Sequence, residues 1–411
     1  MVNPSAPNSF HTEGFALEGE IMATYAVHAA HFVLPGRLTG EGYLTITEGR
    51  FGAFSTERPD CEIVDHAGAY VGAGLVDTHI HGFHNHATTD IDPAGINDAS
   101  VALAQRGTTA WLPTTFTDSA ENIGNQCEAI ADALDERDEG FPGARIPGIY
   151  LEGPFFTEKH KGAQNPKYLV PPSYDVFAEW QRRARGLIRK SALAPEYPEA
   201  PEYISRLAAE GVVTALGHTD ATYDESVAAV DAGATVFVHT YNGMRGLHQR
   251  EPGVLGCAMT TDETYAELIC DGHHVQPGAC AALVRAKGWE HVVLITDCLA
   301  CGGMPEGNYM SGGLPVVMKD DLCYLRNEDG TTGSIAGSVL TLAKGVKNMV
   351  DWGIVAPEQA IRMGSEVAAR SAGVDDVCGS MLPGRHADFN VYAADMTLAA
   401  TYVGGKLVAR A

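Results

Sequence analysis

The chain has 411 residues, of which 45% are hydrophobic and 19% charged, an ordinary composition for a globular protein with a large core. Its formal net charge of −24 argues against nucleic acid as a partner, because the phosphates would be repelled. No apolar run reaches the roughly 18–20 residues of a membrane span, so we expect no membrane contact. Nine cysteines without a secretion signal favour reduced thiols and a cytoplasmic protein.

The N-terminal segment, residues 1–21, carries no strand or helix pattern, and we expect a flexible tail there. Met22 stands directly before the first strand-like run, which makes it a candidate for the natural start of the gene product.

Short alternating runs separated by Gly and Pro follow in residues 22–70, as in TYAVHAAHFV and GYLTITEGRFGAFS. This pattern is typical of small antiparallel strands. Residues 381–411 have the same texture, and YVGGKLV (402–408) indicates two strands around a Gly-Gly turn. We therefore predict one small β-sandwich domain built from both ends of the chain.

Eight apolar, β-branched runs recur between these ends, each followed by a loop rich in Gly, Pro, Asn or Asp and then by a helix-like stretch. Amphipathic periodicity at 202–210, 223–232 and 277–287 indicates helices between the strands. The alternation predicts parallel βαβ units, and their number predicts an α/β fold, a (β/α)8 barrel of the TIM type, over residues 71–380. A doubly wound sheet is the alternative, but no G-x-G-x-x-G motif opens a helix.

The ends of these runs carry residues of the types that bind metals. The candidates are His79, His81, Glu152, His218, His239 and Asp297. In a barrel the carboxyl ends of the strands share one mouth, so residues distant in sequence converge there. The rings of His79 and His81 lie on one face of a strand, because side chains repeat every two residues. Four imidazoles and two carboxylates suit one or two divalent transition ions, zinc or iron.

A purely structural role is the alternative to each of these assignments. A single strand-end histidine is more often a hydrogen-bonded core or surface residue, and a carboxylate before a helix is often an N-cap. His84, His86, His160 and His248 keep that interpretation. The pair Cys298-x-x-Cys301 has no second pair beside it, so we interpret its thiols as buried packing groups. Ligand-type residues at five separate strand ends favour a metal site over coincidence.

Nine short motifs occur in a fixed order along the chain: LVDTHIHG, YLEGPFF, KGAQNP, ALGHTDA, HTYNGM, REPGVLG, DGHHV, ITDCLA and GSIAGSVLTL. This set resembles the N-acetylglucosamine-6-phosphate deacetylases of the amidohydrolase superfamily, over about residues 71–350. The resemblance implies a hydrolase that releases acetate from N-acetyl-D-glucosamine 6-phosphate in amino-sugar catabolism and recycling.

The resemblance also implies a role for each matching position. Glu152, His218 and His239 match the family's core metal ligands, while His79 and His81 match a pair present in its dinuclear members. Asp297 matches the catalytic acid and base. Contacts with the substrate are implied for Ala163, Gln164, Asn242, Gly243, Arg250, His274, Ile335, Ala336 and Gly337.

Three groups among these substrate contacts carry further implications. Asn242 and Gly243 match a turn whose backbone touches the substrate phosphate, with Ala often in place of Gly243. Arg250 matches an arginine that reaches the phosphate in the neighbouring subunit, which implies a homodimer. Residues 335–337 match a loop that lies over the sugar.

One position departs from the family pattern. The family usually has His where this chain has Gln164, and that His contacts the substrate and helps to polarise the amide carbonyl. A neutral amide gives a weaker hydrogen bond than an imidazolium. We therefore expect this chain to rely more on a second metal, bound through His79 and His81, than members with His do.

Amide hydrolysis needs a nucleophile, a polarised carbonyl and a proton for the leaving amine. A divalent metal can lower the pKa of a bound water from about 15.7 to about 7. Asp297 would take a proton from that water and return one to the amine nitrogen. The carbonyl oxygen needs a partner as its negative charge grows.

Three alternatives stay open. A dihydroorotase, hydantoinase or adenosine-deaminase-like protein is the first, although the hydantoinase type has a carboxylated Lys where this chain has Glu152. A deacetylase for N-acetylgalactosamine 6-phosphate is the second, since the two sugars differ only at the C4 hydroxyl. An inactive barrel that serves as a binding protein would require the loss of a ligand, and all six candidates are present.

Overall fold

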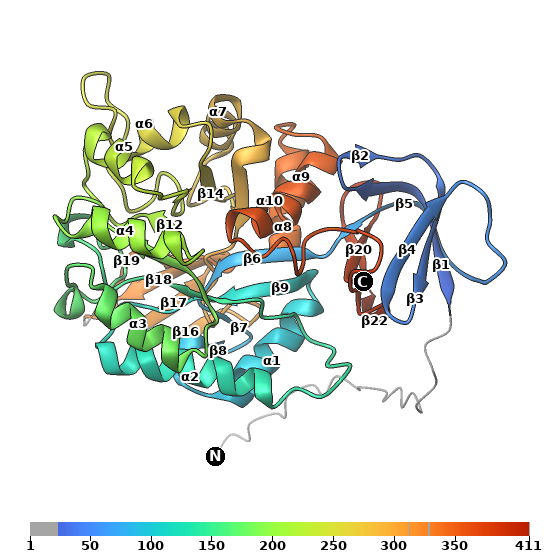
Figure 1. Ribbon diagram of the computed structural model, residues 1–411, viewed down its shortest axis with the longest axis horizontal. Coiled ribbons are helices and arrows are strands. Elements are labelled where there is room, and N and C mark those ends of the chain that lie inside the picture. Colours follow the sequence, from blue (N-terminus) through green and yellow to red (C-terminus); the bar gives the residue numbers. More distant parts are fainter. Residues whose placement is uncertain (1–23, 312, 328, 411) are drawn as a thin grey trace, which may run out of the picture.

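The computed structural model describes residues 24–410, apart from positions 312 and 328. The expected tail over 1–21 and the candidate start at Met22 lie outside these described residues. Figure 1 shows a large body of mixed helices and strands with a smaller sheet at one end, where the C-terminus also lies. Among the described residues, no helix is both long enough and apolar enough to cross a membrane.

Both ends of the chain contribute to one eight-stranded sheet, which we call the terminal sheet. Its strands are β1 (Tyr25–Leu34), β2 (Arg37–Leu38), β3 (Gly42–Thr47), β4 (Arg50–Ser55), β5 (Glu62–Ala73), β20 (Phe389–Tyr392), β21 (Leu398–Val403) and β22 (Lys406–Arg410). The strand order is β22-β21-β20-β5-β1-β3-β4, with β2 paired to β1. The Gly-Gly hairpin is confirmed, because Gly404 and Gly405 join β21 to β22 with φ of 55° and 75°.

Strand β5 joins the strands of the two termini. Strand β5 pairs in parallel with β1 on one edge and antiparallel with β20 on the other. Because β5 uses both edges, the strands from the two termini merge into one hydrogen-bonded sheet. Phe51 of β4 and Phe389 of β20 lie with their ring centroids 6.1 Å apart, so parts of this sheet that are distant in strand order pack against each other. Its buried side chains, among them Phe32, Val71 and Phe389, form a core of their own.

All eight apolar runs of the middle segment contain a strand. These are β6 (Leu75–Ile80), β9 (Thr108–Pro113), β10 (Ile149–Leu151), β11 (Ile188–Leu193), β12 (Val213–Leu216), β13 (Val236–Phe237), β14 (Tyr265–Ile269) and β15 (Val292–Ile295). Strands β10 to β15 form a six-stranded parallel sheet in chain order, which makes a half-barrel, and β6 and β9 form a parallel pair. The parallel strands therefore direct their carboxyl ends to the same side, as the βαβ pattern predicts.

Helices separate most of these strands. They are α1 (Pro93–Ala104), α2 (Ala120–Asp135), α3 (Tyr174–Arg183), α4 (Ala200–Ala209), α5 (Tyr223–Asp231), α6 (Gly253–Thr260), α7 (Pro277–Lys287), α8 (Leu342–Asp351), α9 (Pro357–Met363) and α10 (Glu366–Ser371). The three predicted helices correspond to α4, α5 and α7. At the start of α5, Thr222 and Glu225 form a reciprocal capping box, which fixes where that helix begins.

Short elements connect the longer ones. They are β7 (Gly82–Phe83), β8 (His86–Ala87) and the 3₁₀ turns η1 (Thr88–Asp90), η2 (Glu158–His160), η3 (Pro166–Tyr168) and η4 (Trp289–His291).

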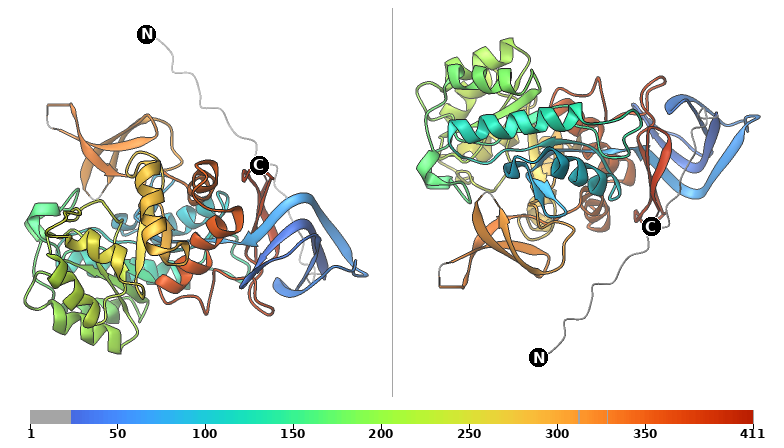
Figure 2. Two further views of the ribbon diagram at one scale, coloured as in Figure 1. Left: turned by 90° about the horizontal axis from the view of Figure 1, so that it is seen from above. Right: turned by 90° about the horizontal axis from the view of Figure 1, so that it is seen from below.

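A four-stranded antiparallel sheet, here the inserted sheet, interrupts the strand–helix alternation after β15. It comprises β16 (Gly307–Ser311), β17 (Leu314–Lys319), β18 (Leu322–Arg326) and β19 (Thr332–Gly337). Figure 2 shows it standing out from the main body, on a side away from the terminal sheet. Residues 335–337 were predicted to form a loop but belong to β19, where they pair with β18.

Turn residues at Gly313, Asp320-Asp321 and Asp329-Gly330 mark the hairpins of the inserted sheet. The sequence therefore carried a signal for this sheet, but it lies within a segment assigned to the barrel.

Candidate metal centre

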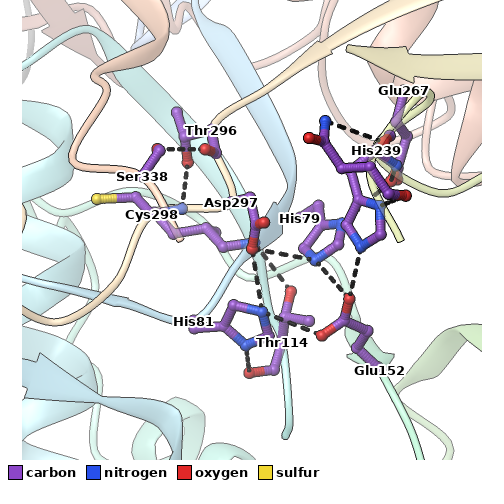
Figure 3. Close-up of polar contacts among 12 residues, drawn as sticks. His79, His81, Thr114, Glu152, His239, Glu267, Thr296, Asp297, Cys298 and Ser338 are labelled. Atoms are coloured by element: carbon purple, nitrogen blue, oxygen red, sulfur yellow. Dashed lines mark hydrogen bonds and ion pairs between the residues drawn. The ribbon is translucent and has the colours of Figure 1, made fainter. Parts of the chain in front are cut away.

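The ligand-type residues at the strand ends converge as predicted. His79 lies in β6 and His81 directly after it, Glu152 follows β10, and three further residues stand two positions beyond β12, β13 and β15: His218, His239 and Asp297. They form two groups, His79–His81–Asp297 and Glu152–His218–His239, and within each group the ligand atoms lie within 4.8 Å of one another. Figure 3 shows His79, His81, Glu152 and Asp297 pointing toward one another.

Glu152 joins the two groups. Its Oε1 lies 3.2 Å from Nε2 of His218, 3.3 Å from Nε2 of His239 and 3.3 Å from Nε2 of His79. Its Oε2 lies 3.2 Å from Nε2 of His81. Asp297 Oδ1 lies 3.2 Å from the same His81 nitrogen and 3.5 Å from Nε2 of His79. One carboxylate thus faces both groups of ligand-type residues.

Backbone strain accompanies three of the six residues. The φ angle is 48° at His218, 27° at His239 and 50° at Asp297. Left-handed backbone costs a non-glycine residue about 1–3 kcal/mol and persists only where its surroundings impose it. All three residues stand at the same place, two positions beyond a strand end, so the strain occurs where these side chains turn into the site.

The four imidazoles are held in one orientation from behind. Nδ1 of His81 lies 3.2 Å from the Thr114 carbonyl oxygen, Nδ1 of His218 lies 2.9 Å from that of His160, and Nδ1 of His239 lies 3.0 Å from that of Asn242. Nδ1 of His79 lies 3.0 Å from a carboxylate oxygen of Glu267. These oxygens only accept, so each Nδ1 donates its proton to them, and each Nε2 presents a lone pair to the site when its ring is neutral.

This orientation makes the site unsatisfied without cations. Nε2 of His218 and Nε2 of His239 lie 3.1 Å apart, and both face Glu152. Nε2 of His79 is buried and has no hydrogen-bond partner among the described residues. Lone pairs that face one another and a carboxylate repel unless a positive charge lies between them. The donor set, imidazole nitrogen and carboxylate oxygen, therefore fits a divalent transition metal.

The pKa shifts reflect the same excess of negative groups over positive charge in the site. Burial alone would lower the pKa of His79, but Glu267, Asp297 and Glu152 outweigh it and raise the pKa to about 10. Burial alone would raise the pKa of Glu152, but His79, His218 and His239 hold it well below its usual range. The carboxylates therefore stay ionised and draw positive charge to the site, whether it comes from protons or from metal ions.

Gln164 is engaged with the ligand shell. Its side chain is buried, its Nε2 donates to Oε2 of Glu152 at 2.6 Å, and its Oε1 accepts the Thr117 backbone N–H at 2.9 Å. Because Thr117 fixes which end of the amide faces the carboxylate, Gln164 orients Glu152. Neighbouring Ala163 lies on the same loop.

Two of the segments predicted to contact substrate lie next to the two groups of ligand-type residues. A side chain at Gly243, where φ is 58°, would come within 3.1 Å of Nδ1 of His218, so the Asn242-Gly243 turn packs against the imidazoles. The end of the inserted sheet also reaches the site, because Ser338, directly after Ile335, Ala336 and Gly337, donates its N–H to the Asp297 carbonyl oxygen at 3.0 Å.

His274 and Arg250 lie outside this network. His274 Nδ1 contacts Asp271 at 2.6 Å beyond β14, and Arg250 is exposed on the loop before α6. The hydrogen bonds and ion pairs of residues 24–410 do not connect either side chain to the six ligand-type residues.

Sequence reasoning missed two charged residues behind the site, Lys190 and Glu267. Both are fully buried, in β11 and β14, and their side chains pair with each other. The available signal was a charged residue inside an apolar strand run, in LIRKSALA and in AELIC. A buried charge requires a partner.

The amidohydrolase family profile matches residues 70–408, most of the chain. The chain belongs to the amidohydrolase family.

This amidohydrolase has curated relatives over most of its length. It is 38% identical to the N-acetylglucosamine-6-phosphate deacetylase of Vibrio furnissii over 82% of this chain and 82% of that one. It is 37% identical to the N-acetylgalactosamine-6-phosphate deacetylase of Escherichia coli O157:H7 over 81% of this chain and 86% of that one.

Solved structures agree with this relationship. A mutant N-acetyl-D-glucosamine-6-phosphate deacetylase from Mycobacterium smegmatis, in complex with N-acetyl-D-glucosamine-6-phosphate, is 28% identical and superposes with a TM-score of 0.87 over 94% of this chain and 100% of that one. The N-acetylglucosamine-6-phosphate deacetylase from Thermotoga maritima is 28% identical, with a TM-score of 0.81 over 93% and 99%.

Metal removal should lower the stability of this amidohydrolase, because the facing lone pairs and carboxylates lose the charge between them. We expect a chelated sample to melt at a lower temperature, and added zinc or ferrous iron to restore the melting temperature. A ligand at 100 times its Kd stabilises by about 2.7 kcal/mol. Scanning calorimetry checks the shift, with His248→Ala, at an exposed histidine, as the control that should respond like the wild type. Equal melting temperatures with and without metal would contradict the assignment.

Proposed function

We propose that this amidohydrolase removes the acetyl group from N-acetyl-D-glucosamine 6-phosphate and yields glucosamine 6-phosphate and acetate, in amino-sugar catabolism and recycling. The observation that carries the proposal is the pair of ligand groups bridged by Glu152, in a chain 38% identical to a curated deacetylase over 82% of its length. We further propose a cytoplasmic enzyme that binds one or two zinc or iron ions per subunit.

The roles that we propose for the six ligand-type residues follow from how far their side chains are exposed. The side chains of His79, His81, Glu152, His218 and His239 are 0–7% exposed, whereas that of Asp297 is 15% exposed. The first five would hold metal, and Asp297 would both touch metal and reach the reacting atoms. Bound metal would supply a polarised carbonyl and a water of lowered pKa. Asp297 Oδ would accept a proton from the attacking water and deliver one to the leaving amine.

We propose that the eight parallel strands close into one (β/α)8 barrel over residues 71–380, with the terminal sheet of 22–70 and 381–411 as a separate small domain. Bridges between Ala110 and Arg145 and between Thr114 and Tyr150 support the junction of β9 with β10. Beyond β15, the Asp297 N–H donates to the His79 carbonyl oxygen at 2.9 Å, and the His81 N–H donates to that of Cys298 at 2.9 Å. These contacts support closure between β15 and β6.

Substrate contacts are proposed for Ala163, Gln164, Asn242, Gly243, Arg250, His274, Ile335, Ala336 and Gly337. The backbone of the Asn242-Gly243 turn would meet the phosphate. Arg250 would reach the phosphate bound by the neighbouring subunit of a homodimer, which agrees with its exposed position on the loop before α6. The second candidate substrate is N-acetylgalactosamine 6-phosphate, because a relative of nearly equal identity carries that name.

Acetate release from the two N-acetylhexosamine 6-phosphates, at defined metal loading, tests the function. We expect the gluco epimer to give the higher kcat/KM. Asp297→Asn should lower kcat by a factor of about 10²–10⁴, the usual contribution of a positioned acid and base. Preference for the galacto epimer would select the second candidate, and no acetate from either sugar would reject both.

Dependence on a second metal is tested at the pair His79 and His81, together with Gln164. We expect the double variant His79→Ala/His81→Ala to lose most of its kcat while it still binds metal through Glu152, His218 and His239. The Gln164→His variant should have a kcat little above that of the wild type, because the side chain at this position contacts Glu152. Steady-state kinetics with metal analysis check both outcomes. A well-folded double variant with near-full kcat would refute the dependence.

Sharing of Arg250 between subunits is tested by complementation. Coexpressed Arg250→Ala and Asp297→Asn chains form mixed dimers in which one site has both groups intact, so we expect about one quarter of wild-type activity from random pairing. Coexpressed Glu152→Gln and Asp297→Asn chains are the matched control and should stay inactive, because each site lacks one ligand. Failure of the first pair to regain activity would argue against donation between subunits.

A further inference from the structure

A single buried carboxylate, Glu267, touches both metal groups from behind. Its Oε2 lies 3.0 Å from Nδ1 of His79, which belongs to one group, and accepts the backbone N–H of His239, which belongs to the other, at 3.1 Å. Both contacts fall on one oxygen atom. Figure 3 shows Glu267 beside His239, on the side of His79 away from His81.

The second oxygen of Glu267 pairs with Lys190. The two side chains are 0% exposed, and Lys190 Nζ also lies 4.0 Å over the ring of Tyr150. Burial alone would raise the pKa of Glu267, but Lys190 and His79 hold it at about 2. A buried pair of this kind is weak evidence for stability, because desolvation offsets much of the attraction. Its placement against two metal groups points to a different role.

His79 differs from the other three histidines in what holds it. Backbone carbonyls of Thr114, His160 and Asn242 accept from the others, whereas an ionised side chain accepts from His79. A carboxylate behind an imidazole fixes the ring and raises the basicity of its far nitrogen. His79 Nε2 lacks any hydrogen-bond partner among residues 24–410, so that basicity is directed into the site.

We infer that Lys190 and Glu267 are a positioning pair that sets metal affinity at both groups, by fixing the His79 ring and the strand end that bears His239. This inference rests on the metal centre of the proposed function. Lys190 acts through Glu267: its ammonium group occupies one oxygen and leaves the other for His79 and His239. The pair is 0% exposed, so neither residue contacts substrate.

The test separates positioning from mere stability with three variants: Glu267→Gln, Lys190→Met and the double variant. Zinc per chain and zinc affinity are measured by competition with a chromophoric chelator, and unfolding is measured in urea. Lys190→Met should be less stable than the wild type, because it leaves a buried carboxylate unpaired. The double variant removes both charges and should regain much of that stability. We expect zinc affinity to fall about 10–100-fold in Glu267→Gln and to stay low in the double variant.

Glu366→Gln is the matched control, because it breaks another mostly buried ion pair, that with Arg362 between α9 and α10. It should lose stability but keep zinc affinity. A stable double variant with wild-type zinc stoichiometry and affinity would overturn the inference, as would equal zinc loss in Glu366→Gln. The proposed function itself fails differently: zinc binding would then be unchanged by His79→Ala and Glu152→Gln.

Discussion

Charge compensation in a buried space is the constraint on which the rest of this structure depends. Four imidazoles and two carboxylates meet in a largely buried space, and two imidazole nitrogens stand 3.1 Å apart. Such a cluster is repulsive without cations between its members. Protons could supply the charge, and the raised pKa of His79 reflects that tendency. Metal ions would supply it with the geometry that imidazole and carboxylate ligands favour.

The fold supplies what such a cluster needs. Parallel strands bring ligands from distant parts of the chain to one side, and left-handed residues beyond three strand ends turn side chains into the site. Backbone carbonyls and Glu267 hold the rings from behind. Gln164 and Thr117 hold the bridging carboxylate from the side. Contacts outside the ligand set therefore fix the ligand side chains, as a precise metal geometry requires.

The inserted sheet contacts two of the ligand-type residues. Its end lies against Asp297 through Ser338, and Phe116, which packs in the core beneath that sheet, stacks on His81 with ring centroids 3.7 Å apart. A displacement of the inserted sheet would therefore reach a ligand and the proposed acid and base together. The strongly negative chain need not repel a phosphorylated sugar, because recognition of one phosphate depends on a few local donors.

The sequence by itself determined the parallel strand–helix pattern, the hairpin at Gly404-Gly405 and the six ligand-type residues, because strand periodicity and strand-end chemistry are local properties. Through the resemblance it also singled out Gln164 as the position expected to depart from the family pattern. Only the tertiary structure decided that Gln164 orients Glu152, that Glu152 lies between the two groups, and that Lys190 and Glu267 stand behind them. It alone merged the terminal strands into one sheet and placed residues 335–337 in a strand. Each of these outcomes depends on which distant segments become neighbours in space, and local sequence patterns do not specify this.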